Sequence, residues 1–395
     1  MDLSARSRTG VERAESPARP PSLPSLTGLR FFAALLVFFA HVVMPVNLVN
    51  QVAPVNPFAN ETIADGLGHW FGHSGYVGVS FFFVLSGFVL TWSRRPAEGV
   101  LAFWRRRLLK VFPNHLVVWA LVMALFAAEV TPVRAWLPNL FLVHAFVPDV
   151  ELLTSVNSLS WSLSCELLFY LLFPFLVRPL LRIPERLLWP AAGAAVAGVA
   201  AVSLLSAHVI PAGAASALGT DLDLGLSQLW FAYFFPPSRL FEFVLGVVLA
   251  RLVVAGRWPR LPVPWVVALA VAGYVVATEG PAPYYFALAT IVPVAAVIGA
   301  AATADLRGAR TPLNRPVTIW LGQVSFAFYM VQTVGIFYLR DALFGTETYG
   351  VAAGTGIVVL LFGLNLSLGW LLYRQVEDPV MRRFGRSRRR THRPA

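Results

Sequence analysis

The sequence predicts an all-α fold: a polytopic transmembrane bundle of about ten helices with both termini in the cytoplasm. Of its 395 residues, 57% are hydrophobic and only 13% are charged, which is too apolar for a soluble globular protein. Apolar stretches recur from residue 28 to residue 373, which excludes both a disordered chain and a signal peptide followed by a soluble domain. The basic residues fall in alternate connections between these stretches, and this alternation indicates how the chain is threaded.

Ten stretches are long and apolar enough to cross a bilayer as helices. A hydrocarbon core of about 30 Å needs roughly 20 helical residues. The predicted spans are 28–49, 76–93, 111–130, 157–180, 187–208, 230–255, 262–279, 284–303, 318–339 and 351–373. The apolar segment 134–148 is too short to span, so we expect an interfacial or re-entrant piece on the outer side.

Positive charge assigns the two sides of the membrane, because Lys and Arg gather on the cytoplasmic side. All 31 basic residues except Arg134, Arg239 and Arg340 lie where the ten spans place the cytoplasm. The predicted location is the plasma membrane. Residues 1–25 are expected to form a disordered cytoplasmic tail, and residues 376–395 a basic cytoplasmic tail that contacts membrane lipids. The charge thus indicates topology and not nucleic-acid binding.

Arg30 and His41 are ionisable residues of the first span, where burial costs free energy. The 11 positions between them are close to three helical turns, so both project from one face, with His41 about 16 Å deeper. Two interpretations stay open. Either the pair is functional, or the arginine reaches the head groups and the histidine is simply hydrogen-bonded.

Glu166 lies inside the fourth span, between Trp161 and Tyr170. Tyr170 follows it by one turn on the same face, where the two can pair. Glu166 either forms a structural pair with a tyrosine, tryptophan or arginine of a neighbouring helix, or it orients or charges a histidine.

Arg239 and Glu242 follow a predicted helix break at Pro236 and Pro237 in the sixth span. Their spacing of three residues allows a local ion pair that removes most of the burial cost. A structural role is therefore favoured.

A basic run at the start of the third span contains Arg106, Arg107 and Lys110, below Pro113. Cations clustered within about one turn suit phosphate groups, although topology alone explains part of the run.

The remaining motifs give weaker signals. Four histidines in outer loops or near span ends are interpreted as structural: His69, His73, His115 and His144. The small residues within 78–88 predict close helix packing, and Ser86 lacks the GxSxG setting of a nucleophile. No metal site is predicted, since Cys165 is the only cysteine and no HExxH motif is present.

Together these motifs resemble acyltransferase family 3, membrane O-acyltransferases of bacterial glycans and natural products. The resemblance covers residues 24–384, and its most specific mark is Arg30 followed, after ten residues, by His41. It implies a transmembrane acyltransferase domain over 26–375. Two departures concern Lys110, where the family has an arginine, and Gln332, where many members have a histidine.

The resemblance implies transfer of an acyl group from acyl-coenzyme A to a hydroxyl of a sugar-containing acceptor. That acceptor is either an envelope glycan or a glycosylated natural product such as a macrolide. Acyl-CoA is then a donor co-substrate, and no cofactor is bound permanently. His41 is the implied base, and Glu166 fixes its tautomer or stabilises the imidazolium. The implied CoA-binding residues are Arg30, Arg106, Arg107 and Lys110, and the implied substrate-binding or structural residues are Trp161, Tyr170, Arg239, Glu242 and Gln332.

A transporter or flippase is the alternative. It would use His41, Glu166 and Arg239 as a proton or substrate relay, and the broken sixth span suits it.

Overall fold

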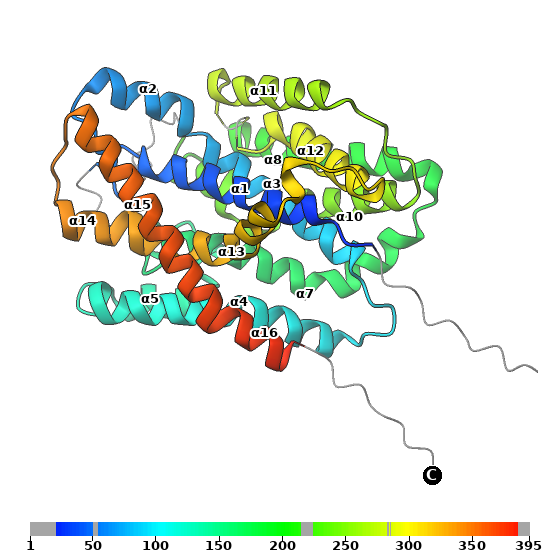
Figure 1. Cartoon of the computed structure of the whole chain (residues 1–395), viewed down its shortest axis with the longest axis horizontal. Coiled ribbons are helices and arrows are strands. Elements are labelled where there is room, and N and C mark those ends of the chain that lie inside the picture. The colour runs from blue at the N-terminus through cyan, green and yellow to red at the C-terminus, as the bar shows by residue number, and fades with distance from the viewer. Residues whose placement is uncertain (1–20, 50–53, 215–223, 283, 285, 386–395) are drawn as a thin grey trace, which may run out of the picture.

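The computed structural model describes residues 21–49, 54–214, 224–282, 284 and 286–385, and it is built from helices (Figure 1). Within these ranges the β structure is limited to one isolated bridge between Phe58 and Tyr349. The longer helices are α1 (Pro24–Val42), α3 (Ser74–Trp92), α4 (Val100–Val122), α7 (Trp161–Arg182), α8 (Leu188–His208), α10 (Leu240–Val254), α11 (Val263–Glu279), α12 (Leu288–Leu306), α13 (Pro316–Gln332) and α15 (Val351–Leu372).

Shorter helices and single turns connect or extend these. The shorter helices are α2 (Glu61–Phe71), α5 (Val133–Leu140), α6 (Val150–Thr154), α9 (Leu226–Leu229), α14 (Leu339–Phe344) and α16 (Asp378–Phe384). The π-helical stretches are η1 (Met123–Ala127), η5 (Trp230–Phe234), η8 (Thr333–Tyr338) and η9 (Tyr373–Glu377). The 3-10 turns are η2 (His144–Phe146), η3 (Ser158–Ser160), η4 (Glu185–Leu187), η6 (Pro236–Arg239) and η7 (Pro312–Asn314).

Eight helical runs in the described part of the chain are long and apolar enough to cross a membrane. The sixth and seventh predicted spans correspond to α10 and α11, which have 15 and 17 residues. The predicted break before α10 is present, because η6 starts at Pro236 and separates η5 from α10. The all-α, multi-pass architecture is therefore confirmed, while the count of ten spans and the cytoplasmic termini stay predictions.

Helix α1 runs through the middle of the bundle and packs against both α3 and α13. Its start is fixed by Asp305 at the end of α12, whose carboxylate accepts hydrogen bonds from the Ser25 backbone at 2.8 Å and hydroxyl at 2.6 Å. A carboxylate at this position satisfies a free N–H group and favours the positive end of the helix. The N-terminal half of α1 is thereby tied to the end of the bundle that holds residue 305.

Close packing of α3 against α10 depends on glycine. A Cβ atom on Gly87 would lie 2.0 Å from the carbonyl oxygen of Phe243, and one on Gly246 would lie 1.9 Å from that of Val84. Either contact is impossible without moving the backbone, so the two helices can approach this closely only without side chains there. The predicted close packing in the second span is confirmed.

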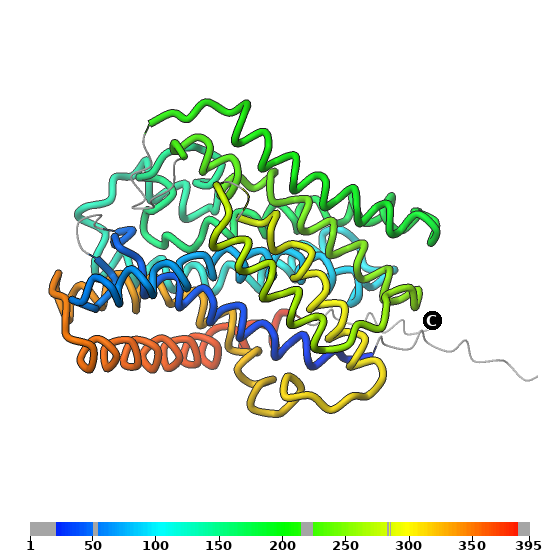
Figure 2. The backbone as a smooth tube through the Cα atoms, turned by 90° about the horizontal axis from the view of Figure 1, so that it is seen from above, coloured from blue at the N-terminus to red at the C-terminus, as the bar shows by residue number. Residues whose placement is uncertain are grey.

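The two described ends of the chain lie toward the same end of the bundle (Figures 1 and 2). Residue 21 contacts the end of α3, where Trp92 donates to the Pro21 carbonyl at 3.0 Å. The segment 134–148 forms α5 and η2, which are too short to span, as expected. The predicted disordered tail 1–25 needs a correction at its end, because α1 begins at Pro24 and Ser25 is buried. Residues 1–20 and 386–395, for which disorder is also predicted, lie outside the described residues.

The C-terminal boundary needs a correction. The predicted tail begins at residue 376, but helical structure continues through η9 and α16 to Phe384. Glu377 is buried and forms an ion pair with Lys110 of α4. The first residues of the predicted tail are therefore part of the folded bundle.

Candidate active site

His41 lies in the last turn of α1 and lines a cavity of about 970 Å³. The end of α1, helix α2, the start of α3 and the segments before α7 and α10 form the cavity wall. Glu61 and Asp65 of α2 also line the cavity and are exposed, so the cavity reaches the protein surface. A dissolved ligand can therefore approach His41 through it.

One hydrogen bond determines how the His41 ring can react. Its Nδ1 atom lies 3.0 Å from Oε1 of Gln332, and the amide nitrogen of Gln332 donates to the Ala34 carbonyl at 3.2 Å. Because a carbonyl can only accept, the amide oxygen must be the atom that faces the ring. The neutral ring is therefore protonated at Nδ1 and carries its lone pair at Nε2. Nε2 has no hydrogen-bond partner among the described residues and is not enclosed by them.

A buried element holds the ring in this orientation. Gln332 is the last residue of α13, and the π-helical stretch η8 follows directly. Phe337 of η8 packs edge to face on the His41 ring, with the ring centroids 5.4 Å apart. Both Gln332 and Phe337 are fully buried. Such π-helical stretches frequently occur at functional sites, and here the stretch places Phe337 on the histidine directly after Gln332.

Aromatic side chains form a continuous part of the cavity wall. Trp161, Tyr233 and Phe234 all line the cavity. The ring centroid of Trp161 lies 4.6 Å from that of Tyr233 and 4.9 Å from that of Phe234. The ring centroids of Tyr76 and Tyr233 are 4.8 Å apart. Flat apolar rings with polar edges suit a sugar or another ring-shaped ligand.

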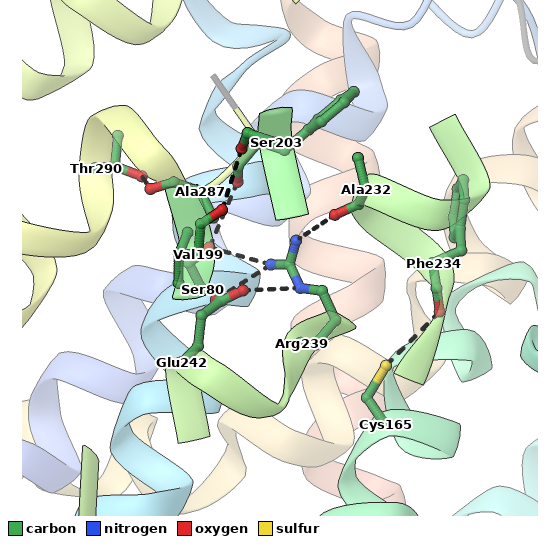
Figure 3. A network of polar contacts seen from close by, with 11 residues as sticks. Ser80, Cys165, Val199, Ser203, Ala232, Phe234, Arg239, Glu242, Ala287 and Thr290 are labelled. Atoms are coloured by element: carbon green, nitrogen blue, oxygen red, sulfur yellow. Dashed lines mark hydrogen bonds and ion pairs between the residues drawn. The ribbon is translucent and has the colours of Figure 1, made fainter. Parts of the chain in front are cut away.

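Behind this wall lies the buried ion pair of Arg239 and Glu242 (Figure 3). Nε of Arg239 is 2.9 Å from Oε1 of Glu242, and the guanidinium also donates to Ser80 at 3.2 Å and to the Ala232 carbonyl at 3.5 Å. The same guanidinium packs over the Tyr233 ring, 5.1 Å from its centroid. The predicted local pair is confirmed, and it supports the aromatic wall from behind.

Glu166 belongs to a second polar group, which we call the inner cluster: Arg30, Arg107, Lys110, Glu166 and Tyr170. The Tyr170 hydroxyl donates to Glu166 at 2.8 Å. Arg30, Lys110 and Arg107 lie close enough for their charges to act on Glu166. The N-terminal half of α1, the start of α4 and the middle of α7 therefore meet here, away from the cavity.

The basic run of α4 is only partly free to bind a ligand. Arg106 pairs with Glu98 at 2.7 Å, and Lys110 pairs with Glu377. Arg107 has no close carboxylate partner in the described part of the chain, and it packs over the Tyr170 ring at 6.0 Å. Of the three predicted phosphate-binding residues in this run, Arg107 is the one without a competing ion pair.

A polar stripe on α7 joins the cavity to the inner cluster. Ser158, Ser162, Glu166 and Tyr170 follow one another at intervals of four residues along η3 and α7, so each lies near the next, with the direction turning by about 40° at each step. Ser158 lines the cavity, and the Ser162 hydroxyl contacts the Tyr329 hydroxyl at 2.7 Å. The stripe is the polar connection between the two sites.

One sequence-based expectation needs correction. Gln332, and not Glu166, hydrogen-bonds the His41 ring, so Glu166 does not fix its tautomer in this structure. The relay of a transporter stays an alternative prediction; in the structure His41, Glu166 and Arg239 pair with Gln332, Tyr170 and Glu242 respectively.

The histidines outside the first span fall into two groups. His115 and His144 are fully buried, and His115 bonds the Asn139 carbonyl at 3.1 Å, as a structural role requires. His69 and His73 instead line the cavity. Of the aromatic cavity wall, sequence reasoning singled out Trp161 but not Tyr233 and Phe234, although the aromatic run 230–235 was a visible signal.

Comparison with known proteins gives a consistent assignment. A family described as an acyltransferase domain matches residues 23–374. The acyltransferase MdmB of Streptomyces mycarofaciens is 38% identical over 94% of this chain and 95% of its own length. The exopolysaccharide production protein ExoZ of Rhizobium meliloti is 27% identical over 83% of this chain and 96% of its own length.

A third relative shares only part of its length with this chain. The O-acetyltransferase OatA of Staphylococcus aureus is 27% identical over 43% of this chain and 27% of its own length. No solved structure matches the chain. The match over nearly the whole helical bundle shows that this multi-pass membrane protein is an acyltransferase that belongs to acyltransferase family 3.

Proposed function

We propose that this protein is an O-acyltransferase of the plasma membrane that moves an acyl group from acyl-coenzyme A to a hydroxyl of a sugar-containing acceptor. His41 acts as the general base. The observation that carries the proposal is the Nε2 atom of His41: this residue lines a surface-reaching cavity, Gln332 holds Nδ1, and Nε2 has no hydrogen-bond partner among the described residues. This is the tautomer and orientation that a base acting on a bound alcohol requires.

The inner cluster is the proposed site for the phosphates of the donor. Coenzyme A is a polyanion of the cytosol, and the predicted topology puts Arg30 and Arg107 on the cytoplasmic side. These two arginines lack close carboxylate partners among the described residues, so they make the main phosphate contacts. Arg106 and Lys110 contribute charge while they stay paired with Glu98 and Glu377.

The donor arm must reach from the inner cluster to the cavity. Helical rise puts His41 about 16 Å from Arg30 along α1. On α1 the cavity extends down to Val37, and packed side chains separate it from Arg30. The polar stripe of α7 extends over the same distance between the inner cluster and the cavity. We propose that the thioester arm enters along this stripe and displaces the side chains that are packed there.

The acceptor occupies the cavity and so approaches from the end opposite the inner cluster. Its aromatic wall suits a sugar ring, and its volume of about 970 Å³ accommodates more than one ring. One of the relatives is an exopolysaccharide production protein, which supports a glycan as the acceptor. A macrolide that carries a sugar would also fit the aromatic cavity wall.

Transfer needs one proton to move twice. The acceptor hydroxyl loses its proton to Nε2 of His41 as its oxygen attacks the thioester carbon. When the carbon–sulfur bond breaks, the imidazolium returns that proton to the leaving thiolate, which gives free coenzyme A and the ester. The acceptor bound in the cavity keeps bulk water from hydrolysing the thioester.

The test uses purified protein, radiolabelled acetyl-CoA and a panel of oligosaccharides and glycosylated macrolides. We expect label to appear in an ester of one acceptor, with one free coenzyme A released for each ester formed. Absence of transfer to every acceptor, combined with accumulation of a solute in vesicles that contain the protein, would instead identify a transporter.

Replacing Arg107 by glutamine should weaken binding of coenzyme A about tenfold, because a charge-assisted hydrogen bond to phosphate is worth roughly 1.5 kcal/mol or more. Calorimetric titration of the purified variant with coenzyme A measures the change. The matched control is Arg105→Gln, since Arg105 belongs to the same basic run but is exposed. An unchanged affinity of Arg107→Gln for coenzyme A would mean that the basic run marks the cytoplasmic side of the membrane and does not bind the donor.

A further inference from the structure

The segment between α6 and α7 has two unusual features next to the His41 cavity. Val156 has a φ of 48°, a left-handed conformation that β-branched residues rarely adopt. Ser158, two residues later, lines the cavity and is only 4% exposed, and its hydroxyl has no hydrogen-bond partner among the described residues. Backbone strain and unpaired buried polar groups both cost free energy, and both are typical of functional sites.

The strained conformation is held by hydrogen bonds from η8. The Tyr338 hydroxyl donates to the Val156 carbonyl at 3.1 Å, and the Thr333 hydroxyl donates to the side-chain oxygen of Asn157 at 2.7 Å. The same oxygen of Asn157 accepts from the Leu159 backbone at 3.2 Å. Hydrogen bonds therefore hold the chain on both sides of Ser158, at Val156 and Asn157 before it and at Leu159 after it.

The same element also holds His41. Gln332, which directly precedes η8, bonds the His41 ring, and Phe337 within η8 packs on it. One buried stretch therefore fixes both the histidine and the segment that carries Ser158. Reactive groups have to be held in this way, because small displacements between them lower the rate strongly.

Two other hydroxyl groups of the cavity wall are already engaged. The Thr154 hydroxyl donates to the Val150 carbonyl at 2.8 Å. The Tyr329 hydroxyl contacts the Ser162 hydroxyl at 2.7 Å. Ser158, in contrast, keeps a free O–H group that nearby protein atoms do not use.

We propose that Ser158 is a second catalytic residue, whose hydroxyl donates a hydrogen bond to the carbonyl oxygen of the acyl thioester. This assignment rests on the proposed function. When the acceptor oxygen bonds to the thioester carbon, the acceptor proton passes to His41 and the carbonyl electron pair moves onto oxygen. Ser158 stabilises that negative oxygen and keeps its own proton. The pair returns as the carbon–sulfur bond breaks, and His41 protonates the sulfur.

Ser158→Ala tests the proposal in the purified full-length protein, with acetyl-CoA and the panel acceptor that the wild type acylates fastest. We expect kcat to fall about 10²-fold, as for loss of one donor to a developing oxyanion. The KM for acetyl-CoA should stay within about twofold, because the donor phosphates bind elsewhere. The unfolding temperature should not fall, because the substitution removes no hydrogen bond.

Two further variants make the comparison specific. Ser164 is also on α7, is 1% exposed and has an unpaired hydroxyl, but it does not line the cavity. Ser164→Ala should therefore keep the wild-type kcat. Ser158→Cys keeps the size of the side chain but is a weaker donor, so its kcat should lie between those of wild type and Ser158→Ala.

The possible outcomes distinguish failure of the Ser158 assignment from failure of the proposed function. A folded Ser158→Ala protein with wild-type kcat overturns the assignment, and so does an equal loss in Ser164→Ala. If Ser158→Ala does not fold, a folded Ser158→Cys protein with full kcat overturns it instead. A wild-type protein that transfers acetyl to no acceptor overturns the proposed function itself, and the Ser158 assignment with it.

Discussion

Replacing His41 by alanine should abolish acyl transfer, with a fall in kcat of about 10²–10⁴-fold. The loss is expected because His41 lines the cavity, its Nε2 has no hydrogen-bond partner in the described part of the chain, and Gln332 already occupies Nδ1. Single-turnover measurements with radiolabelled acetyl-CoA and a saturating acceptor separate this chemical step from product release.

Donor binding provides the control for His41→Ala. The inner cluster lies about 16 Å away along α1, so coenzyme A should bind the variant with nearly unchanged affinity. Folding should also survive, because the ring stands in a cavity wall and its main contacts are Gln332 and Phe337. Full turnover in a folded His41→Ala protein would remove this residue from the chemistry.

Replacing Gln332 by leucine should lower kcat about 10–100-fold, the usual cost of losing the partner that orients a reactive histidine. Leucine fills a similar volume but offers no acceptor to Nδ1, so the ring can rotate and can protonate Nε2 instead. Steady-state kinetics should show the fall in kcat without a matching change in the KM for acetyl-CoA.

Gln332→Glu is the conservative comparison. A neutral glutamic acid can accept from Nδ1 of His41 with one oxygen and donate to the Ala34 carbonyl with the other, which reproduces both glutamine contacts. We therefore expect it to retain much more activity than Gln332→Leu. Equal activity in both variants and wild type would mean that the tautomer of His41 does not limit transfer.

Much of the fold could be predicted because membrane helices depend on local properties. Apolar length and arginine placement are read directly along the chain, and the break at Pro236 follows from proline geometry. The helical run past residue 375 was missed, because Glu377 is polar in the sequence. It becomes a core residue only when Lys110 of α4 pairs with it.

The site was predictable where its geometry is local to one helix. Arg239 and Glu242 pair at a spacing of three residues, as predicted. For Glu166 a partner on a neighbouring helix was expected, but the donor is Tyr170, one turn away on the same helix. The partner of His41 was not predictable in this way. Which residue of another helix stands level with the histidine depends on how the helices are shifted along their axes, and a single sequence does not contain that information.

Ser158 illustrates the same limit. In the sequence it is one of several serines near Trp161, and nothing separates it from Ser160, Ser162 or Ser164. Its distinguishing features are an unpaired hydroxyl, a place in the cavity wall and strained backbone nearby. All three arise from tertiary contacts with η8.

The central claim, that the acceptor is acylated in the cavity at His41, is tested most directly by cysteine protection. Cys165, the only cysteine, is fully buried, so a Cys165→Ala, His41→Cys protein carries one thiol, at the proposed site. The account predicts that a water-soluble maleimide labels this thiol in the folded protein, and that an acceptor acylated by the wild type slows the labelling. A thiol that is not labelled, or that is labelled equally fast with saturating acceptor, would contradict it.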